Sequence, residues 1–443
     1  MSDLFSDVAD RLVDILQAPD DPRAKREYLH WDKLRHLEPP ENLSSREWWL
    51  KIKLDRSSDS RPLPLQDGAA EAFGYTLPDQ ILRRLHFVDQ RCSGEIAMEE
   101  VVADDEAAKQ HYLVNSLMEE SIRSSQLEGA STSRRVAKEL LTTGRAPRDR
   151  SERMILNNYR AMQFMRESVG DRLTPEAVLS LQRVLTEGTL DDPNAAGRLQ
   201  TPDDDRVAVF ARNDGELLHR PPPASELPVR LDLMCEFANQ ADDHEPFIHP
   251  VVRAVILHFW LAYDHPFEDG NGRTARALFY WLMRTRGYWL AEYLSISRIL
   301  RGAPAQYVRA FLLSETDGND LTYFLDYHLE VVEKAVDELH RYLKRKTTEI
   351  RTVERLLRGA PEFNHRQLAL LSDAIRHPER SYTFGEHAGV HGVTHETART
   401  DISALADRAL FERRRVGRRL IFSPPADLAE RLRAADDAPT RAA

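Results

Sequence analysis

The amino-acid sequence predicts a mainly α-helical protein, on three observations. Apolar residues recur at helical spacing through almost every long segment of residues 105–358. Start and stop residues bound several of these segments, since Thr174 and the proline after it open one helix and Gly129 closes another. Before the C-terminal tail, one short stretch, residues 206–219, has the alternation typical of strands. We therefore expect a helical bundle interrupted by one β-hairpin.

Composition and charge limit the function classes. The 443 residues are 42% hydrophobic and 30% charged, which indicates a globular chain rather than a disordered one. The net charge of -11 argues against a protein that coats nucleic acid, while it leaves room for one basic module. Cys92 and Cys235 have no metal-ligand spacing and predict no disulfide framework. With no signal peptide and no apolar run of membrane-spanning length, we expect a cytoplasmic protein without a membrane partner.

Three regions follow one another along the chain. Residues 1–104 are rich in tryptophan, proline and polar turns, and predict an irregular, helical N-terminal extension. Residues 105–345 carry the helical bundle. Residues 360–425 switch to a helix, a short helix with a turn, an amphipathic helix and two short strands turning at Gly417. This order resembles a winged helix-turn-helix domain, whose partner is DNA or another protein.

The strand-like stretch reads RVAVFARNDGELLH. Val207, Val209 and Phe210 face Leu217 and Leu218 across an Asn-Asp-Gly sequence, which is a turn signal. The pattern predicts a β-hairpin.

One run, DHPFEDGNGRTAR at residues 264–276, connects two segments that are apolar nearly all round and predict buried helices. Pro266 ends the first helix, and Phe267 supplies an apolar anchor for the connection. We expect this loop to be held rigidly at both ends.

The flexible and basic residues of this run suit a polyphosphate. Gly270, Asn271 and Gly272 let the backbone approach a ligand, and they lead into a helix start that favours an anion. Arg273 and Arg276 lie on one helical face near that start. Together these residues predict a cradle for several phosphate groups.

Two further residues complete the chemistry. Asp269 can hold magnesium, a hard cation that prefers a carboxylate plus phosphate oxygens. His265 has a pKa range suited to taking a proton from an attacking hydroxyl. Each feature alone is common in structural loops, and their coincidence in one short run favours attack on a nucleotide phosphate. His244, His249 and His258 lack metal-ligand spacing and are predicted to be structural.

The run HPFEDGNGRTAR resembles the signature of the Fic (Fido) family, His-Pro-Phe-x-Asp-Gly-Asn-Gly-Arg-x-x-Arg, at every position. The surrounding helical segments, with GRLQ before the hairpin and LHRPPP after it, also resemble a Fic domain. The resemblance implies a Fic helical bundle with a β-hairpin flap. It also implies AMPylation, the transfer of AMP from ATP to a Ser, Thr or Tyr hydroxyl of a target protein, including automodification.

The same resemblance implies a role for each signature residue. His265 is the general base, and Asp269 holds Mg²⁺ on the α- and β-phosphates of ATP. Arg273 contacts the β-phosphate, and Arg276 contacts the γ-phosphate. The nucleotide- and phosphate-binding residues are Phe267, Gly270, Asn271, Gly272, Arg273 and Arg276.

The hairpin lies where the family has its flap, which grips the target segment by strand addition. The residues implied in docking are Val207, Ala208, Val209 and Phe210. A plain hairpin without such a role is the alternative.

A second short stretch, SSQLEG at residues 124–129, predicts a regulatory contact. Gly129 closes a helix, and Glu128 at the helix C-terminus opposes the dipole, so we expect a cationic partner for it. The stretch resembles the inhibitory motif of the Fic family, Ser/Thr-x-x-x-Glu-Gly/Asn, on an inhibitory helix at residues 108–129. By that resemblance Ser124, Glu128 and Gly129 form the motif, and Glu128 pairs with Arg276 in the place of the γ-phosphate.

Other functions stay open. A phosphotransferase branch of the family departs from the Gly-Asn-Gly-Arg segment, whereas this chain does not. A related activity removes AMP from modified targets, with an acid near the site activating water. In a third alternative, the chain is a transcriptional regulator whose winged helix binds DNA and whose nucleotide site senses ATP. A homodimer is the further partner that we consider.

Overall fold

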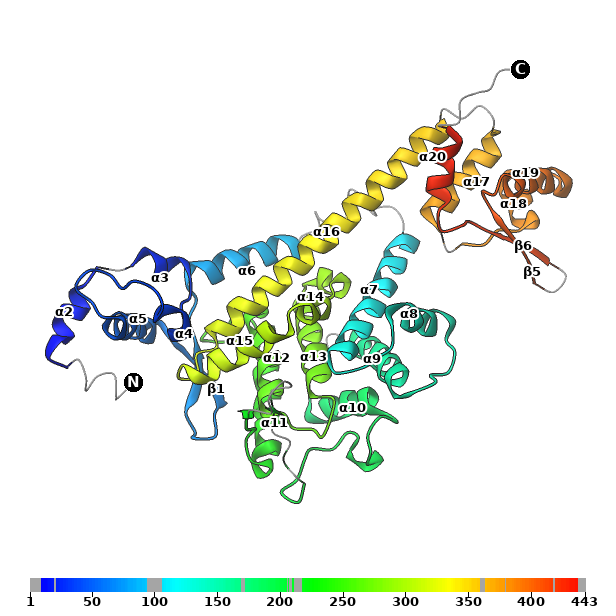
Figure 1. Ribbon diagram of the computed structural model, residues 1–443. Coiled ribbons are helices and arrows are strands. Elements are labelled where there is room, and N and C mark those ends of the chain that lie inside the picture. The colour runs from blue at the N-terminus through cyan, green and yellow to red at the C-terminus, as the bar shows by residue number, and fades with distance from the viewer. Residues whose placement is uncertain are drawn as a thin grey trace. The chain divides into compact units, whose positions relative to one another are not determined.

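The computed structural model describes residues 9–19, 21–93, 106–168, 172–204, 206, 209–210, 217–358, 363–378, 380–416 and 419–436. These residues are mainly helical, and each sheet among them is a pair of antiparallel strands (Figure 1). The predicted mainly α fold class is therefore confirmed. The chain divides into two compact units: Met1–Glu95 with Leu113–Asp337, and Ile96–Tyr112 with Glu338–Ala443.

Two long helices form the centre of the first unit. Helix α12 (Pro250–Asp264) is buried nearly all round, as its apolar sequence predicts, and it packs against α13 (Asn271–Thr285). Helices α9 (Arg150–Glu167), α10 (Pro175–Thr186) and α11 (Leu227–Asn239) surround this pair. The loop between α12 and α13 is thus fixed by the core on both sides.

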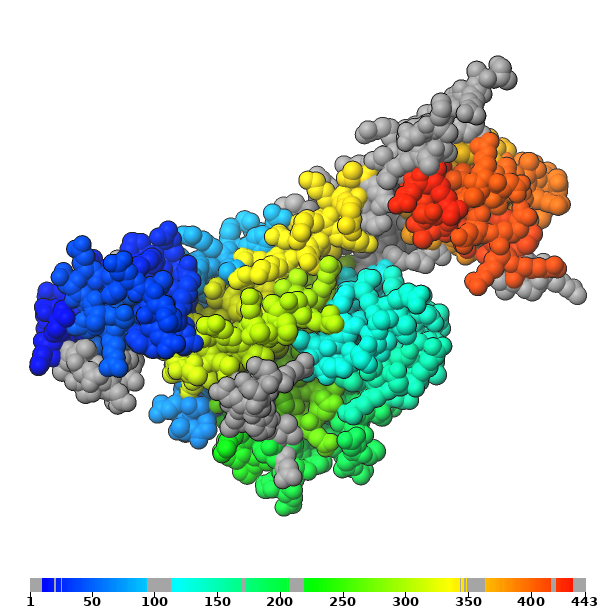
Figure 2. All heavy atoms as spheres, viewed as in Figure 1, coloured from blue at the N-terminus to red at the C-terminus, as the bar shows by residue number. Residues whose placement is uncertain are grey.

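Helix α7 (Glu106–Leu127) leads from the second unit into the first. Near its C-terminal end, the Ser125 hydroxyl donates to Met154 O on α9, and the Asn158 amide of α9 donates to Ser121 O. Ile122 packs with a cluster of apolar residues from α8 (Arg134–Thr143) and α9. In the space-filling view, α7, α8 and α9 form one continuous surface, coloured cyan to teal (Figure 2). These contacts bring the stretch 124–129 against the centre of the unit.

The N-terminal region is more regular than the sequence predicted. It contains α5 (Ser45–Asp59), which begins with a capping box at Ser44, and a hairpin that we did not expect. The hairpin strands are β1 (Arg61–Gln66) and β2 (Ala72–Tyr75), and the prolines in β1 hid the strand pattern. Its helices besides α5 are α2 (Leu12–Gln17), α3 (Pro22–Arg26), α4 (Trp31–Leu34) and α6 (Asp79–Cys92).

This N-terminal hairpin is part of the core of the first unit. Phe73 is fully buried, and its ring lies 5.4 Å from that of Phe259 and 4.9 Å from that of Tyr263, centroid to centroid. Leu321 N donates to Gly74 O across 2.8 Å, which ties β2 to the start of α16 (Thr322–Arg358). The hairpin therefore supports the C-terminal end of α12.

The predicted central hairpin is present as two short strands. Strand β3 (Val209–Phe210) pairs with β4 (Leu217–His219), with Val209 opposite His219. Val207, Ala208 and the Asn-Asp-Gly turn lie outside the described residues. The unit is completed by α14 (Ile296–Gly302), α15 (Pro304–Thr316) and the long α16 (Thr322–Arg358), which continues into the second unit.

The second unit follows the predicted element order. Helices α17 (His365–Arg376), α18 (Phe384–His391) and α19 (His395–Asp407) precede strands β5 (Glu412–Val416) and β6 (Arg419–Ser423), and α20 (Leu428–Asp436) follows. A third extended segment joins the strand pair, because Tyr382 and Phe422 exchange backbone hydrogen bonds. Gly417 and Arg418 lie outside the described residues. The core of this unit includes Leu371, Ile402, Leu405 and Phe422.

Candidate active site

The shape of the loop between α12 and α13 is held by contacts among its own residues. Phe267 is fully buried, which anchors the loop as the sequence predicted. The side-chain amide of Asn271 makes two hydrogen bonds to the backbone of Phe267. Its oxygen accepts from Phe267 N at 3.0 Å, and its nitrogen donates to Phe267 O at 2.7 Å. The side chain of Asn271, which the family resemblance assigned to phosphate, here holds the loop shape.

His265 caps α12 in a left-handed conformation, with φ 45° and ψ 54°. Its Nδ1 lies 3.3 Å from Ala262 O, which can only accept, so Nδ1 carries the proton and Nε2 has a free lone pair. The pKa of His265 is lowered to about 4, mainly by burial and to a smaller extent by nearby His219 and Arg206, while the Ala262 carbonyl and Glu128 oppose the shift. The imidazole is therefore neutral at physiological pH and can accept a proton at Nε2.

Gly270 and Gly272 shape the start of α13. Gly270 has φ +88°, and a Cβ on it would lie 2.9 Å from Thr186 Cγ2. A Cβ on Gly272 would lie 2.2 Å from Glu128 Oε1 and 3.1 Å from the NH1 nitrogen of Arg276. The missing side chain of Gly272 thus leaves the space that the Glu128 carboxylate fills.

Arg276 is buried beneath this space. Its Nε donates to the Ser124 hydroxyl at 2.9 Å, and its NH2 nitrogen donates to Ser124 O at 3.2 Å and to Glu128 Oε1 at 2.7 Å. Burial works against the charge, but the Glu128 carboxylate raises the pKa of Arg276 above its usual value. Within the described residues, the NH1 nitrogen of Arg276 is buried without a hydrogen-bond partner. This donor lies beside the space above Gly272 that the Glu128 carboxylate fills.

Arg273 and Asp269 lie on the other side of the cradle. Arg273 is fully buried and donates to Asp269 Oδ1 at 3.1 Å and to Leu185 O at 3.0 Å. Its Nε has no hydrogen-bond partner among the described residues. The Asp269 side chain is 35% exposed and also accepts from Gly270 N at 2.5 Å.

These residues fit a divalent cation only together with a phosphate ligand. The part of the chain that the structure describes has no group of three or more His, Cys, Asp or Glu side chains able to hold a metal. Asp269 offers one accessible carboxylate, and Mg²⁺ typically takes one or two carboxylates with phosphate and water oxygens. The donor set therefore suits Mg²⁺ carried in by a polyphosphate.

A buried layer of aromatic and imidazole rings lies behind the site. His258 Nε2 bonds to the Tyr307 hydroxyl at 2.7 Å, and its ring is 4.7 Å from that of His328. Both ring nitrogens of His328 lack a hydrogen-bond partner within the described residues. The structural role predicted for His258 agrees with this packing.

Two residues near the site escaped the sequence analysis. Arg206 precedes β3, His219 is the last residue of β4, and both bond to backbone carbonyls at the end of α12. A single arginine and a single histidine carry no local pattern, and the only signal was their position beside the predicted hairpin. The side-chain positions of Val209 and Phe210, like Val207 and Ala208 altogether, lie outside the described residues.

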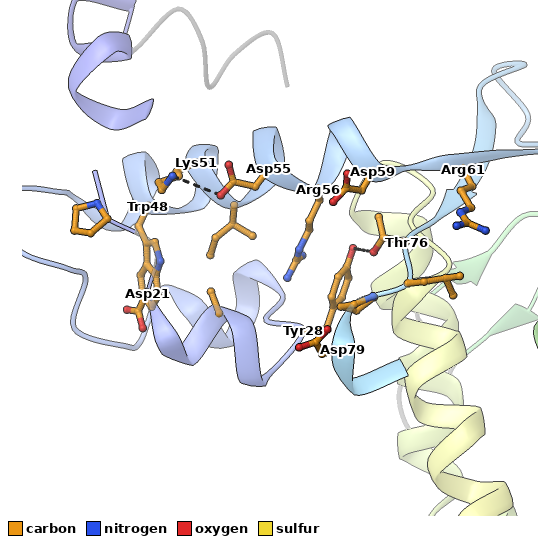
Figure 3. Close-up of a pocket in the computed structure, with 15 residues that line it drawn as sticks. Asp21, Tyr28, Trp48, Lys51, Asp55, Arg56, Asp59, Arg61, Thr76 and Asp79 are labelled. Atoms are coloured by element: carbon orange, nitrogen blue, oxygen red, sulfur yellow. Dashed lines mark hydrogen bonds and ion pairs between the residues drawn. The ribbon is translucent and has the colours of Figure 1, made fainter. Parts of the chain in front are cut away.

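A separate hollow of about 690 Å³ lies in the N-terminal region and is lined by none of the predicted site residues (Figure 3). Its charged side chains are largely engaged within the protein. Lys51 lies 3.6 Å from Asp55, and the Arg56 guanidinium lies 3.5 Å from the centre of the Tyr28 ring. The residues of the predicted chemistry therefore lie elsewhere than in this hollow.

Among the described helices, none combines the length and apolar character that crossing a membrane requires.

Comparisons with known proteins also point to this loop. The model of the Fic/DOC family matches residues 172–283. Protein adenylyltransferase Fic of Drosophila virilis is 37% identical over 70 residues, which cover 16% of this chain and 14% of that protein. The protein of the same name from Aedes aegypti is 39% identical over 71 residues, with the same shares. The chain thus spans only 14% of the length of these curated relatives.

A solved structure extends the likeness of fold. The crystal structure of a Fic family protein from Desulfovibrio desulfuricans G20 aligns over 80% of this chain and 98% of its own, with a TM-score of 0.53 and 18% sequence identity. At that identity the match concerns the fold alone, and it agrees with the mainly helical bundle.

Proposed function

We propose that this chain, whose residues 172–283 match the Fic/DOC family model, transfers AMP from ATP to a hydroxyl of a protein side chain. One observation carries the proposal. The Glu128 carboxylate lies in the space above Gly272, on the Arg276 guanidinium and at the start of α13, which is a seat for an anion. A terminal phosphate of ATP has the charge and oxygen donors for the same seat. The relatives with matching segments are named protein adenylyltransferases.

In the proposed reaction His265 is the general base. Its Nε2 removes the proton of the target hydroxyl while the oxygen attacks the α-phosphorus of ATP. The bond from that phosphorus to the bridging oxygen breaks, and pyrophosphate leaves. The product is a phosphodiester of AMP on the target. The negative charge of bound ATP raises the pKa of His265 from its low value toward the working pH.

The cradle stabilises the charge that develops during transfer. Arg273 and Arg276 offer buried donors without partners in the described structure, and α13 adds the positive end of its dipole. Asp269 would hold Mg²⁺, which neutralises phosphate charge when bound. Positioning and charge stabilisation supply nearly all the catalysis in such transfers.

We propose that the arrangement with Glu128 on Arg276 is an inhibited one. With the γ-phosphate excluded from its seat, ATP binds with its α-phosphate turned away from in-line attack. Transfer by the wild-type protein is then weak. Ser124 accepts two further hydrogen bonds from Arg276 and so holds the guanidinium where it contacts Glu128.

Removal of AMP is the second candidate, because the same carboxylate could orient a water molecule. The Glu128 side chain is 30% exposed and lies in the site. A purified AMP-modified target separates the two activities, because Glu128→Gly stops removal but raises transfer.

For the other regions we propose an N-terminal extension at residues 1–104, a Fic domain at residues 105–345 and a winged-helix domain at residues 360–425. The second unit supplies helices α17–α19 followed by the β5–β6 pair, which is the element order of a winged helix. The proposed partners are ATP, a target protein, DNA or protein at the winged helix, and a second copy of the chain. The proposed location is the cytoplasm.

Labelling with tagged ATP tests the transfer. Glu128→Gly is incubated with the tagged nucleotide and a cell lysate, and protein-linked AMP is measured by gel and mass spectrometry. We expect labelled protein with Glu128→Gly and none with Glu128→Gly combined with His265→Ala. Equal labelling by these two variants would rule out His265 as the base.

A further inference from the structure

Helix α12 ends with backbone carbonyls that have no partner inside the helix. Two side chains, one before β3 and one at the end of β4, bond to three consecutive carbonyls there. His219 Nε2 donates to Tyr263 O at 2.7 Å. The Arg206 guanidinium donates to Asp264 O at 2.6 Å and to His265 O at 2.7 Å. These contacts complete the end of the helix that carries the proposed base.

Arg206 joins three parts of the chain through one planar group. It lies three residues before β3, and its Nε donates at 2.9 Å to Pro222 O, which follows β4. Its NH1 nitrogen donates both to His265 O and to the Gln200 side chain, and Gln200 N donates to Pro266 O at 2.9 Å. The guanidinium therefore ties both ends of the hairpin to the turn that contains His265.

His219 makes the matching contact from the other strand. Its Nδ1 lies 2.8 Å from a carboxylate oxygen of Glu315 on α15, and its ring lies 4.6 Å from that of Tyr263, tilted by 50°. Because the carbonyl of Tyr263 can only accept, Nε2 of His219 donates to it. The imidazole therefore joins β4 to both α15 and the end of α12.

The turn held by these contacts is strained. The φ of 45° at His265 lies in the left-handed region, which residues other than glycine rarely adopt. Such a conformation persists only where its surroundings fix it. The carbonyls of Tyr263, Asp264 and His265 are fixed by the hairpin, so the hairpin and the direction of the imidazole depend on each other.

We propose that Arg206 and His219 are positioning residues that couple the β3–β4 hairpin to His265 and hold its imidazole in the direction that attack requires. This role rests on the proposed AMP transfer. The coupling itself does not, because it concerns the geometry of the free protein.

Hydrogen exchange tests the coupling without any activity. Backbone exchange of the peptide covering residues 262–271 is followed by mass spectrometry in wild type, Arg206→Ala and His219→Ala. We expect exchange at least tenfold faster in both variants, because the turn relaxes when its carbonyls are released. Arg198→Ala is the matched control, since Arg198 precedes the hairpin and its guanidinium donates to Asp204 and to Leu199 O instead of to the three carbonyls at the end of α12. Unchanged exchange in both alanine variants would overturn the proposal.

Transfer in the Glu128→Gly background tests the consequence for the base. We expect Arg206→Ala and His219→Ala to lower kcat tenfold or more and to leave the affinity for ATP, measured by calorimetry, within twofold. His219→Gln keeps one donor for Tyr263 O and should restore part of kcat. A loss of ATP affinity equal to the loss of transfer would overturn the positioning role.

The two tests also separate the coupling from the proposed function. If the Glu128→Gly protein transfers no AMP at all, the proposed function fails, and the exchange experiment still decides the coupling. Melting temperatures within a few degrees of wild type guard against misfolding, and Arg206→Lys replaces Arg206→Ala if the latter does not fold. The lysine variant should also exchange faster, because one ammonium cannot bridge four acceptors.

Discussion

The Glu128 carboxylate lies 2.7 Å from the Arg276 guanidinium, although 148 residues separate them in the chain. The contact joins the end of α7 to the first turns of α13. It satisfies a carboxylate that is unfavourably placed at a helix C-terminus and an arginine that is buried. The same contact fills the proposed seat of a phosphate, so the proposed inhibition and the burial of Arg276 rest on one ion pair.

Replacing Glu128 should therefore raise activity. In Glu128→Gly the seat is free, and Arg276 keeps its two bonds to Ser124. ATP can then bind with its α-phosphate oriented for in-line attack. We expect AMP transfer to rise tenfold or more, measured as protein-linked AMP per unit time. Glu128→Gln is the informative control, because it fills the same space without the charge and should give an intermediate rate. Equal rates for wild type and Glu128→Gly would show that Glu128 is not a brake.

Gly272→Ala should close the seat to both occupants. The added Cβ would lie 2.2 Å from Glu128 Oε1, and the backbone of Gly272 is not left-handed, so crowding is the main effect. We expect the new methyl group to displace Glu128 and also to exclude a phosphate from the same space. The affinity for ATP, measured by calorimetry, should therefore fall at least tenfold. Gly302→Ala is the matched control, because no atom lies within 4 Å of its new Cβ. ATP affinity equal to that of wild type would contradict a phosphate seat above Gly272.

The sequence predicted those parts of the site that are local in the chain. The loop 264–276 contains its base, carboxylate, glycines and arginines in one run, and flanking apolar helices indicated that the run is held by the core. The need of Glu128 for a cation followed from its place at a helix end. The inhibitory role of the contact with Arg276 stays a prediction.

What the sequence did not predict depends on distant contacts. The β1–β2 hairpin was missed because Pro62 and Pro64 disturb the strand pattern, although Phe73 lies in the core beside α12. Arg206 and His219 were missed because a residue that caps a helix from another element leaves no periodic signal. The partners of a helix end are fixed by tertiary packing and not by its own residues.

His328 should make the first unit sensitive to acid. Burial lowers the pKa of His328 to about 3, helped by the charge of Arg276, against a usual value near 6.5. Between these two values the unfolded chain binds a proton that the folded chain does not, so stability falls as pH falls. We expect this residue alone to cost about 2 kcal/mol of unfolding free energy at pH 5 relative to pH 7.5.

His328→Phe measures that cost. The histidine ring already packs among Phe279, Phe324 and His258 and has no hydrogen-bond partner in the described structure, so phenylalanine fits the site chemically. Urea unfolding followed by tryptophan fluorescence at the two pH values should show a smaller loss for the variant than for wild type. The control variant His244→Asn, at an exposed position, should lose as much unfolding free energy between the two pH values as wild type does. Equal losses for His328→Phe and wild type would mean that His328 does not titrate as its burial requires.

The second unit should bind duplex DNA weakly and in a salt-dependent way. Arg399 on α19 and Arg413, Arg414 and Arg415 on β5 are exposed, which are the positions of a recognition helix and a wing. Arg399 lies 3.8 Å from Glu396 and Arg413 lies 3.4 Å from Asp407, and these two pairs are largely exposed and weak. In fluorescence anisotropy with a mixed-sequence duplex, we expect binding at about 50 mM salt that is lost near 200 mM.

Arg414→Ala with Arg415→Ala should lower the salt slope by about two, roughly one for each phosphate contact, while Arg301→Ala in the first unit should leave it unchanged. The chain as a whole carries a net charge of -11 and repels a polyanion, so any binding must come from this local basic surface. No binding at the lower salt concentration would exclude DNA as the partner and favour dimerisation or target docking by this unit.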